Sequence, residues 1–291
     1  MSSKKRFRIW AGILAVLLVM LTVSLYALFR TPRTEEPAAA PDPVPSAAPS
    51  EEPVPEPEEY EYDAETLHAL SSELAEDTGI NPDVKALLCF ESGLIHTPVL
   101  QSADVNEYLY KDWQTGEYLS YGSIVLEPEN DLSRDDQNTI IYGHYIYEFR
   151  NPDRTLAFTP LEQLMKEEAL EDNRYVSLIT ADDVRYYEIA AVFECPLETY
   201  EGYQYAPEGL EYNLLAYDRD YMELYRKRIA EHEYYSTGIE FDETDRFLSL
   251  QTCIEGKADS REIVLCRELK RTSLTETEQR YENGTEGKDN S

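Results

Sequence analysis

Eight short stretches rich in β-branched, aromatic and other apolar residues constrain the fold of this chain most strongly. Each is four to ten residues long, and polar residues typical of turns separate them. Stretches of this kind are typical of β-strands, and several of them in series predict a mostly β domain that closes, or nearly closes, into a barrel. The eight predicted strands are residues 84–90, 95–100, 123–126, 139–142, 175–180, 184–193, 247–251 and 263–266.

Two helices are predicted outside the central strands. Residues 64–77 place Leu67, Leu70 and Leu74 on one side at helical spacing, and the Asn81-Pro82 step ends this pattern. We expect an N-terminal helix that packs on the barrel. A second helix, residues 159–170, is predicted from Thr159 as a cap, Pro160 at the first helical position and Glu162 placed to return the capping bond.

A long insertion, rich in helix formers, lies between Tyr200 and Phe247. Within it, residues 218–232 place Tyr221, Leu224, Tyr225 and Ile229 on one face at helical spacing. This pattern predicts a long helix inserted before the cysteine-bearing strand.

The N-terminal part does not have the composition of a folded domain. Residues 9–29 are apolar and uncharged, about the 20 residues needed to cross a bilayer, and four basic residues precede them. We therefore expect a cytoplasmic segment at residues 1–8, a membrane anchor at residues 9–29 and an extracellular remainder. A cleaved signal peptide is the alternative, although the apolar run is long for one.

Composition also sets the boundaries of the folded part. Residues 30–59 carry prolines every few positions among Ala, Ser and Glu, which favours an extended extracellular linker. After residue 270 the chain has almost no apolar residues, so we predict a disordered tail at residues 271–291. A single domain at residues 60–270 remains.

The formal net charge of −32 excludes nucleic acid as a partner, because phosphates require clusters of Lys and Arg. A cationic amine would be mildly attracted. Of the four cysteines, Cys89, Cys195 and Cys266 lie in apolar stretches and are interpreted as small buried side chains, with a Cys89–Cys195 disulfide left open.

Three residues at the ends of predicted strands carry the chemistry. His144 closes Asn138-Thr-Ile-Ile-Tyr-Gly-His144, Cys253 closes Leu248-Ser-Leu-Gln-Thr-Cys253, and Arg261 opens Arg261-Glu-Ile-Val-Leu. A thiolate is a nucleophile, an imidazole delivers a proton to a leaving amine, and a guanidinium stabilises charge on a carbonyl. Together they predict covalent acyl transfer.

Each of the three has a structural alternative. A strand cysteine is commonly buried and inert, and Arg261 could pair with one of many carboxylates. His68, His96 and His232 are interpreted as surface or packing residues. Arg261 shares a strand face with Ile263 and Leu265, so it reaches a scissile carbonyl if these two face the floor of the groove.

The order of these motifs resembles the sortase family of cysteine transpeptidases from Gram-positive cell surfaces. Ile80-Asn-Pro-Asp-Val, Ile95-His-Thr-Pro-Val-Leu-Gln101 and Gly122-Ser-Ile-Val-Leu precede the His144 motif in the order of the family, so the likeness spans about residues 80–268. The long insertion is similar to that of class B sortases. Two positions depart from the family pattern: Ser249 stands where Thr is usual, and Gln251 where class B usually has Ser.

The resemblance implies a closed eight-stranded sortase-like barrel and a reaction. Cys253 would attack a Thr carbonyl in a C-terminal sorting motif of a secreted protein and form a thioester. An amine of a peptidoglycan precursor, or a pilin lysine, would then receive the acyl group. A cysteine peptidase and a non-catalytic wall-binding module are the alternatives.

Substrate contacts are predicted at Thr252 and Gln251 beside the thiol, and at Tyr205 and Tyr212 in the tyrosine-rich insertion, although packing is the simpler interpretation of the tyrosines. No set of His, Cys, Asp and Glu has metal-ligand spacing, and no glycine-rich phosphate loop is present. We expect neither a metal nor another cofactor.

Overall fold

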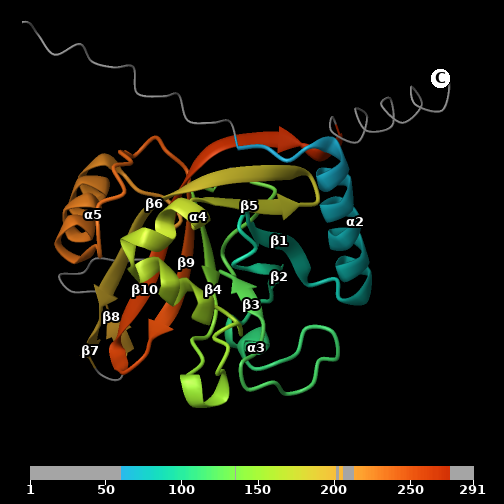
Figure 1. The fold of residues 1–291 in the computed structure, drawn as a ribbon, viewed down its shortest axis with the longest axis horizontal. Coiled ribbons are helices and arrows are strands. Elements are labelled where there is room, and N and C mark those ends of the chain that lie inside the picture. The colour runs from blue at the N-terminus through green and yellow to red at the C-terminus, as the bar shows by residue number, and fades with distance from the viewer. Residues whose placement is uncertain (1–59, 135, 201–202, 206–212, 276–291) are drawn as a thin grey trace, which may run out of the picture. The chain divides into compact units, whose positions relative to one another are not determined.

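Eight strands form a closed barrel in the order β1-β2-β3-β4-β9-β10-β6-β5 (Figure 1). The structure is a computed structural model that describes residues 60–134, 136–200, 203–205 and 213–275. These residues fall within one compact unit, residues 57–291. The predicted mostly β, eight-stranded barrel is confirmed. Its strands are β1 (Val84–Phe90), β2 (His96–Leu100), β3 (Ile124–Leu126), β4 (Asn138–Tyr142), β5 (Tyr175–Thr180), β6 (Asp183–Pro196), β9 (Phe247–Ile254) and β10 (Lys257–Ser273).

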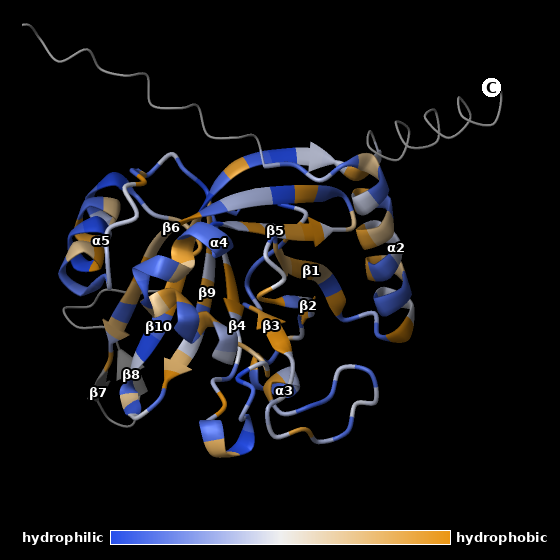
Figure 2. Cartoon of the chain, in the orientation of Figure 1, coloured by the Kyte–Doolittle hydropathy of each residue, from blue (hydrophilic) through white to orange (hydrophobic). Residues whose placement is uncertain are grey.

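Alternation along each strand separates the inside of the barrel from the outside. On β9, Leu248 and Leu250 belong to the cluster that fills the barrel, whereas Phe247 belongs to a cluster on the outer face. Successive strand residues point to opposite faces, so a strand that is buried on both sides becomes apolar throughout. Figure 2 shows this as mainly orange strands between helices of mixed colour.

Two helices cover the outer face. The N-terminal helix α2 (Ala64–Ile80) begins at Asp63, whose carboxylate accepts a 2.7 Å bond from the Thr66 amide, and it buries Leu67, Leu70 and Leu74. In α5 (Arg219–His232), which lies in the insertion, Asp218 is the corresponding cap. The apolar side of α5, formed by Met222, Tyr225 and Ile229, packs on β6 and β10. Both predicted helices are confirmed.

The predicted helix at residues 159–170 was wrong in type. The chain forms two 3-10 helices, η2 (Thr159–Met165) and η3 (Glu167–Ala169), before a short α4 (Leu170–Asn173). The expected capping box is absent from η2. The Thr159 hydroxyl instead accepts a bond from the Ile146 amide at 2.9 Å, and Glu162 accepts one from the Tyr145 hydroxyl at 2.7 Å. Tertiary partners therefore compete successfully for both capping side chains.

Smaller elements complete the described chain. The insertion carries a separate two-stranded sheet that the sequence did not indicate, and β10 continues to Ser273, three residues beyond the predicted boundary of the domain. These elements are α3 (Asn106–Leu109), η1 (Glu148–Arg150), β7 (Glu198–Tyr200) and β8 (Tyr203–Tyr205).

The predicted anchor and the linker lie outside the described residues, as does the tail from residue 276. In the part of the chain that the structure describes, no helix has the length and apolar character of a membrane span.

The cysteines Cys89, Cys195 and Cys266 are buried free thiols, as the packing interpretation predicted. The Cys89–Cys195 disulfide left open by the sequence is not formed. Burial raises the pKa of the Cys89 thiol to about 12 and that of Cys195 to about 11, so both stay protonated and inert at neutral pH.

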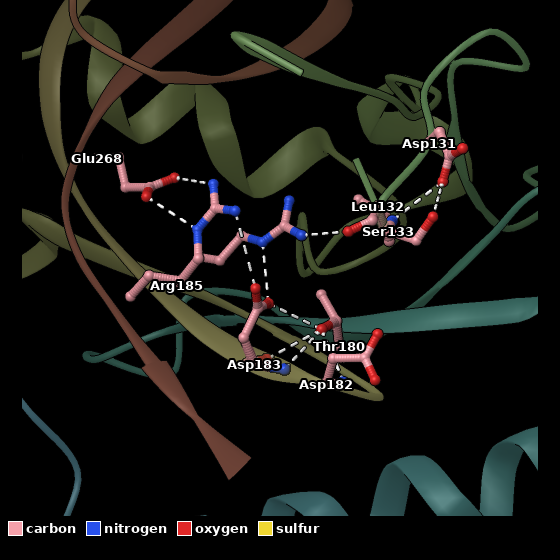
Figure 3. A network of polar contacts seen from close by, with 9 residues as sticks. Asp131, Leu132, Ser133, Thr180, Asp182, Asp183, Arg185 and Glu268 are labelled. Carbon is pink, nitrogen blue, oxygen red and sulfur yellow. Dashed lines mark hydrogen bonds and ion pairs between the residues drawn. The ribbon is translucent and has the colours of Figure 1, made fainter. Parts of the chain in front are cut away.

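A charged network lies at the end of the barrel where β5 turns into β6 (Figure 3). Arg185, only 2% exposed, donates from Nε to Asp183 at 2.9 Å and from its terminal nitrogen to the Leu132 carbonyl. Arg271 pairs with Glu268 at 2.8 Å, and its other terminal nitrogen lies 3.8 Å from Asp183. These contacts tie the loop before β4 to the β5–β6 turn and to the C-terminal half of β10.

Candidate active site

A cleft of about 460 Å³ opens on the outer face of the barrel where β10, β9, β4 and β3 lie side by side. It contains all three residues of the predicted catalytic set, His144, Cys253 and Arg261. The other lining residues come from the segment around α3, from the position after β3, from β4 and the residue after it, from the insertion and from β9: Val105, Leu109, Tyr110, Glu127, Tyr142, Gly143, Asn213, Gln251 and Thr252.

Strand register brings Cys253 and Arg261 together. The two residues are direct partners across the antiparallel β9–β10 pair. Opposite residues of such a pair have Cβ atoms about 5 Å apart on the same face. Cys253 is the only exposed cysteine of the chain, and Arg261 Nη1 donates a 2.9 Å bond to the Ser260 carbonyl. A guanidinium on the same strand face as an accessible thiol can donate to a carbonyl oxygen that the thiol attacks.

His144 reaches the cleft through the parallel pairing of β4 with β9. Tyr142 lies opposite Gln251, and the Gly143 amide donates a 3.2 Å bond to the Gln251 carbonyl, so His144 stands level with Cys253. Position 143 has no room for a side chain. A Cβ there would lie 2.5 Å from Ile124 Cδ1 and 2.6 Å from Phe158 Cγ. Packing therefore requires the glycine that precedes the histidine.

The environment of His144 favours the neutral imidazole in the resting protein. Burial lowers the pKa of His144, and a hydrogen bond with the Leu109 backbone opposes this effect only partly. The Tyr110 ring packs against the imidazole with centroids 4.9 Å apart. Nε2 is buried and has no hydrogen-bond partner among the described residues. No group of the described structure therefore holds this nitrogen in a competing hydrogen bond.

A polar cluster joins the loop after His144 to the turn after Cys253. The Tyr145 hydroxyl lies 2.7 Å from Glu162 Oε2 and 2.8 Å from Glu255 Oε2, and the Arg154 guanidinium contacts both carboxylates and the hydroxyl. Arg154 has φ 52° and Ala157 φ 50°, conformations that cost energy for non-glycine residues. We call Tyr145, Arg154, Glu162 and Glu255 the clasp, because they connect the two segments that carry the imidazole and the sulfur.

The substrate-binding predictions have separate outcomes. Gln251 lines the cleft. Thr252 also lines it, but its side chain is buried and its hydroxyl has no partner among the described residues, so the backbone is the part of Thr252 that a ligand can reach. Tyr205 belongs to β8, and its side chain is not described. Tyr212 lies outside the described residues. A substrate role for these four residues stays a prediction.

The proposed floor of the groove was wrong in one respect. Ile263 and Leu265 do share the strand face of Arg261, but both are fully buried in the cluster beneath α5. The cleft lies to the other side of Arg261, over β9 and β4. Glu262, which points into the barrel opposite Thr252, is fully buried with both carboxylate oxygens unpartnered in the described structure. Burial raises the pKa of Glu262 to about 8, with a further contribution from Glu162.

Several residues of the cleft were missed by the sequence reasoning. Leu109 and Tyr110 hold the imidazole, Tyr142 and Glu127 form a hydrogen-bonded pair at 2.7 Å, and Asn213 contributes from the insertion. Tyr142 and Glu127 had a detectable signal, because each stands at or next to the end of a predicted strand near the catalytic motif. Leu109 ends the four-residue helix α3 and Asn213 lies in a turn, and neither belongs to a run long enough for periodicity to give information.

The titratable side chains of the described structure do not gather as metal ligands do. Among residues 60–275, apart from the gaps in the description, no group of three or more His, Cys, Asp and Glu side chains is arranged to hold a metal ion. The groups present are those of nucleophilic acyl transfer: an accessible thiol, a cation beside it and an imidazole with an open nitrogen.

The chain is similar to known proteins in sequence and in fold. No protein-family model matches the sequence. The sortase B of Listeria monocytogenes is 27% identical over 200 residues, which cover 67% of this chain and 73% of that protein. The crystal structure of Clostridium perfringens sortase B is 26% identical, with a TM-score of 0.55 over 67% of this chain and 99% of that chain.

Two further structures share the fold at lower identity. A Staphylococcus aureus sortase B–substrate complex is 17% identical, with a TM-score of 0.58 over 71% of this chain and 93% of that one. A sortase B complexed with triglycine is 19% identical, with a TM-score of 0.57 over 71% of this chain and 94% of that one. The barrel and its inserted helix are therefore those of class B sortases.

Proposed function

We propose that this chain, which belongs to the sortase B family of cysteine transpeptidases, is a membrane-anchored enzyme that joins secreted proteins to an amine of the cell surface. The observation that carries the proposal is the register of β9. This strand holds an exposed thiol directly opposite Arg261 and level with His144, inside one cleft.

Acylation of the thiol is the first step. The thiol gives its proton to His144 Nε2, and the thiolate sulfur attacks the carbonyl carbon of a Thr in the donor peptide. The C–N bond breaks, and the imidazolium returns the proton to the departing amine. A thioester on Cys253 and a shortened donor are the products. The low pKa of His144 suits this role, because a buried imidazolium gives up its proton readily.

Transfer to the acceptor reverses these roles. A neutral amine attacks the thioester carbonyl, the C–S bond breaks and the sulfur leaves as thiolate. His144 takes the surplus proton of the new amide nitrogen. One amide replaces another and the thioester conserves the acyl activation between the two steps, so no nucleotide is required.

Arg261 would stabilise the oxygen of the tetrahedral intermediates. Its guanidinium stands across the strand pair from the sulfur, and its position is fixed by the 2.9 Å bond to the Ser260 carbonyl. A planar fork of donors presented to a developing oxyanion lowers the barrier more than a point charge would.

Donor and acceptor are proposed from the named complexes. A related sortase B is complexed with a substrate and another with triglycine, which support a peptide donor and a peptide amine acceptor for this cleft. We propose a C-terminal sorting motif as the donor and a peptidoglycan precursor as the acceptor, with a pilin lysine as the alternative amine. The apolar residues 9–29 would anchor the enzyme with its catalytic domain outside the cell.

Peptide ligation tests this function. The extracellular part, residues 30–291, would be incubated with candidate sorting peptides, with and without triglycine, and the Cys253 adducts and products followed by mass spectrometry. We expect a thioester that hydroxylamine cleaves and a ligated product that replaces hydrolysate when amine is added. Cys253→Ala should form neither. Hydrolysis alone at saturating amine would instead make the protein a cysteine peptidase.

A further inference from the structure

We propose that Glu127 and Tyr142 form a subsite of this cleft for an ammonium group on a side chain of the donor peptide. The inference rests on the proposed function, because it concerns the peptide that Cys253 would acylate. Nothing in the catalytic steps uses either residue, although both line the cleft.

The pair stands where the edge of the sheet opens into the cleft. Glu127 follows β3 and continues its pairing through a 2.9 Å bond from its amide to the Ile140 carbonyl. The Tyr142 hydroxyl donates to Glu127 Oε2 at 2.7 Å. This bond fixes one carboxylate oxygen and leaves the lone pairs of the other oxygen for a second donor.

The charge of Glu127 is not compensated within the described structure. It is the only carboxylate among the described residues that line the cleft, and in the same part of the chain no ion pair joins it to Lys or Arg. The side chain is half-buried. A partly desolvated carboxylate that is held by a neutral hydroxyl attracts a cation more strongly than a fully exposed one.

Distance separates this subsite from the reacting bond. From the strand register, Glu127 lies four residues along the sheet from Cys253, about 13 Å, and two strands across it, about 10 Å. The resulting separation, about 16 Å, is too long for the amine that attacks the thioester. A lysine side chain about two to four residues from the scissile Thr in an extended peptide spans it.

The two charges of the cleft also give the peptide a direction. Arg261 stands at one end beside the sulfur and Glu127 at the other. An extended donor peptide can place its scissile carbonyl oxygen near Arg261. A basic side chain farther along the same peptide would then lie near Glu127. A donor with an acidic side chain at that position would meet Glu127 and be rejected.

Substitution by the isosteric amide isolates the charge. Glu127→Gln keeps an oxygen that can accept the Tyr142 hydroxyl proton. Glu129→Gln is the matched control, because Glu129 is an exposed carboxylate two residues away that does not line the cleft. Each protein would be given donor peptides with Lys, Gln or Glu at each of the four positions before the scissile Thr, and kcat/KM measured at low and high salt.

At one position we expect Lys to be preferred over Gln by about tenfold, because a charge-assisted bond at a half-buried site is worth about one to two kcal/mol. Glu127→Gln should remove most of this preference and its salt dependence, and Glu129→Gln should retain both. A Lys preference that survives in Glu127→Gln, or none at any position, would overturn the subsite. A preference for a cationic acceptor amine that depends on Glu127, without any such preference for the donor peptide, would also overturn the subsite.

Direct binding separates this proposal from the proposed function. The same peptides would be titrated into Cys253→Ala, with and without Glu127→Gln, by calorimetry. If no donor is acylated but Lys peptides still bind more tightly in a Glu127-dependent way, the subsite stands and the transpeptidase proposal fails. If donors are acylated without such a difference, the subsite fails and the transpeptidase proposal stands.

Discussion

The two ends of β10 carry similar residues in opposite electrostatic conditions. Near its C-terminal end, Arg271 pairs with Glu268, and on the adjacent strand β6 Arg185 pairs with Asp183 (Figure 3). Near its N-terminal end, Arg261 stands beside an exposed thiol, and the neighbouring Glu262 is buried without a partner in the described structure. The first end pairs its charges internally, while the second presents a cation and a thiol to the cleft and buries a carboxyl that has no partner among the described residues.

This difference indicates which end serves stability and which serves chemistry. Breaking a buried ion pair leaves an uncompensated charge, so substitutions at the Arg185 end should act on folding. Arg261 lines the cleft, so its substitution should act on turnover, whereas Glu262 is buried beneath the cleft and should act on stability through its protonation. Each prediction below tests one side of this contrast.

Replacement of Arg185 should have the largest effect on stability. Arg185→Met removes the buried partner of Asp183 and the bond to the Leu132 carbonyl, and should lower the free energy of unfolding by about 3–5 kcal/mol. Urea unfolding measures this loss in the free energy of unfolding. As a control, Arg134→Met removes an exposed pair with Asp131 and should cost at most about 1 kcal/mol. Equal losses in the two variants would show that the Arg185 end is not specially stabilising.

Replacement of Arg261 should give the reverse result. Arg261→Lys keeps the positive charge but loses the planar fork of donors, and should lower kcat/KM for ligation about 100-fold, or about 2.7 kcal/mol, with unfolding unchanged within about 0.5 kcal/mol. Arg271→Lys at the other end of the strand should lower stability and leave turnover per folded molecule intact. Near-normal ligation by Arg261→Lys would remove Arg261 from the mechanism.

Glu262 should make stability depend on pH. Its pKa is about 8 in the folded protein against an ordinary value of 4.5, so between these pH values the unfolded chain ionises while the folded protein keeps its proton. The free energy of unfolding should therefore fall as pH rises from 4.5 to 8, by at most about 1.4 kcal/mol per unit. Below pH 4.5 the contribution of Glu262 to the free energy of unfolding is fully retained.

Glu262→Gln should remove this slope. At pH 8 the variant should be about 2 kcal/mol more stable than the wild type, because the lost ionisation penalty exceeds the cost of a buried amide. Urea unfolding at pH 5, 6.5 and 8 tests this, with the exposed Glu129→Gln as the control. A slope that is identical in all three proteins would place the responsible group elsewhere.

The clasp should have the smallest effect, confined to activity. Glu255→Gln weakens the contact of the Cys253 turn with Arg154 and Tyr145 but leaves Glu162 in place, and should lower kcat/KM about three- to fivefold by loosening the alignment of thiol and imidazole. The deficit should shrink at high salt, where the wild-type pair is screened. Glu168→Gln, an exposed carboxylate of η3, is the control. A variant that ligates as fast as the wild type at low salt would exclude a positioning role.

The barrel and the catalytic set could be predicted from the sequence because both depend on local patterns. Strands such as residues 175–180 and 184–193 are apolar runs bounded by turn residues, and His144, Cys253 and Arg261 stand at strand ends. The 3-10 geometry of residues 159–165 could not be predicted, because Tyr145 and Ile146 take the partners that would have capped an α-helix. Glu127 stands beside a predicted strand end, but its bond to Tyr142 on the neighbouring strand β4 could not be predicted, because it depends on how the two strands pair.

The parallel pairing of β4 with β9 also has a consequence for biosynthesis. His144 and Cys253 meet only when two segments more than a hundred residues apart have been joined, and β10 must close the ring behind them. Such a distant closure is slow and comes late in folding. A chain delivered only part of the way therefore carries the imidazole without the thiol or the cation, and the enzyme acquires reactivity only after nearly the whole domain has been delivered.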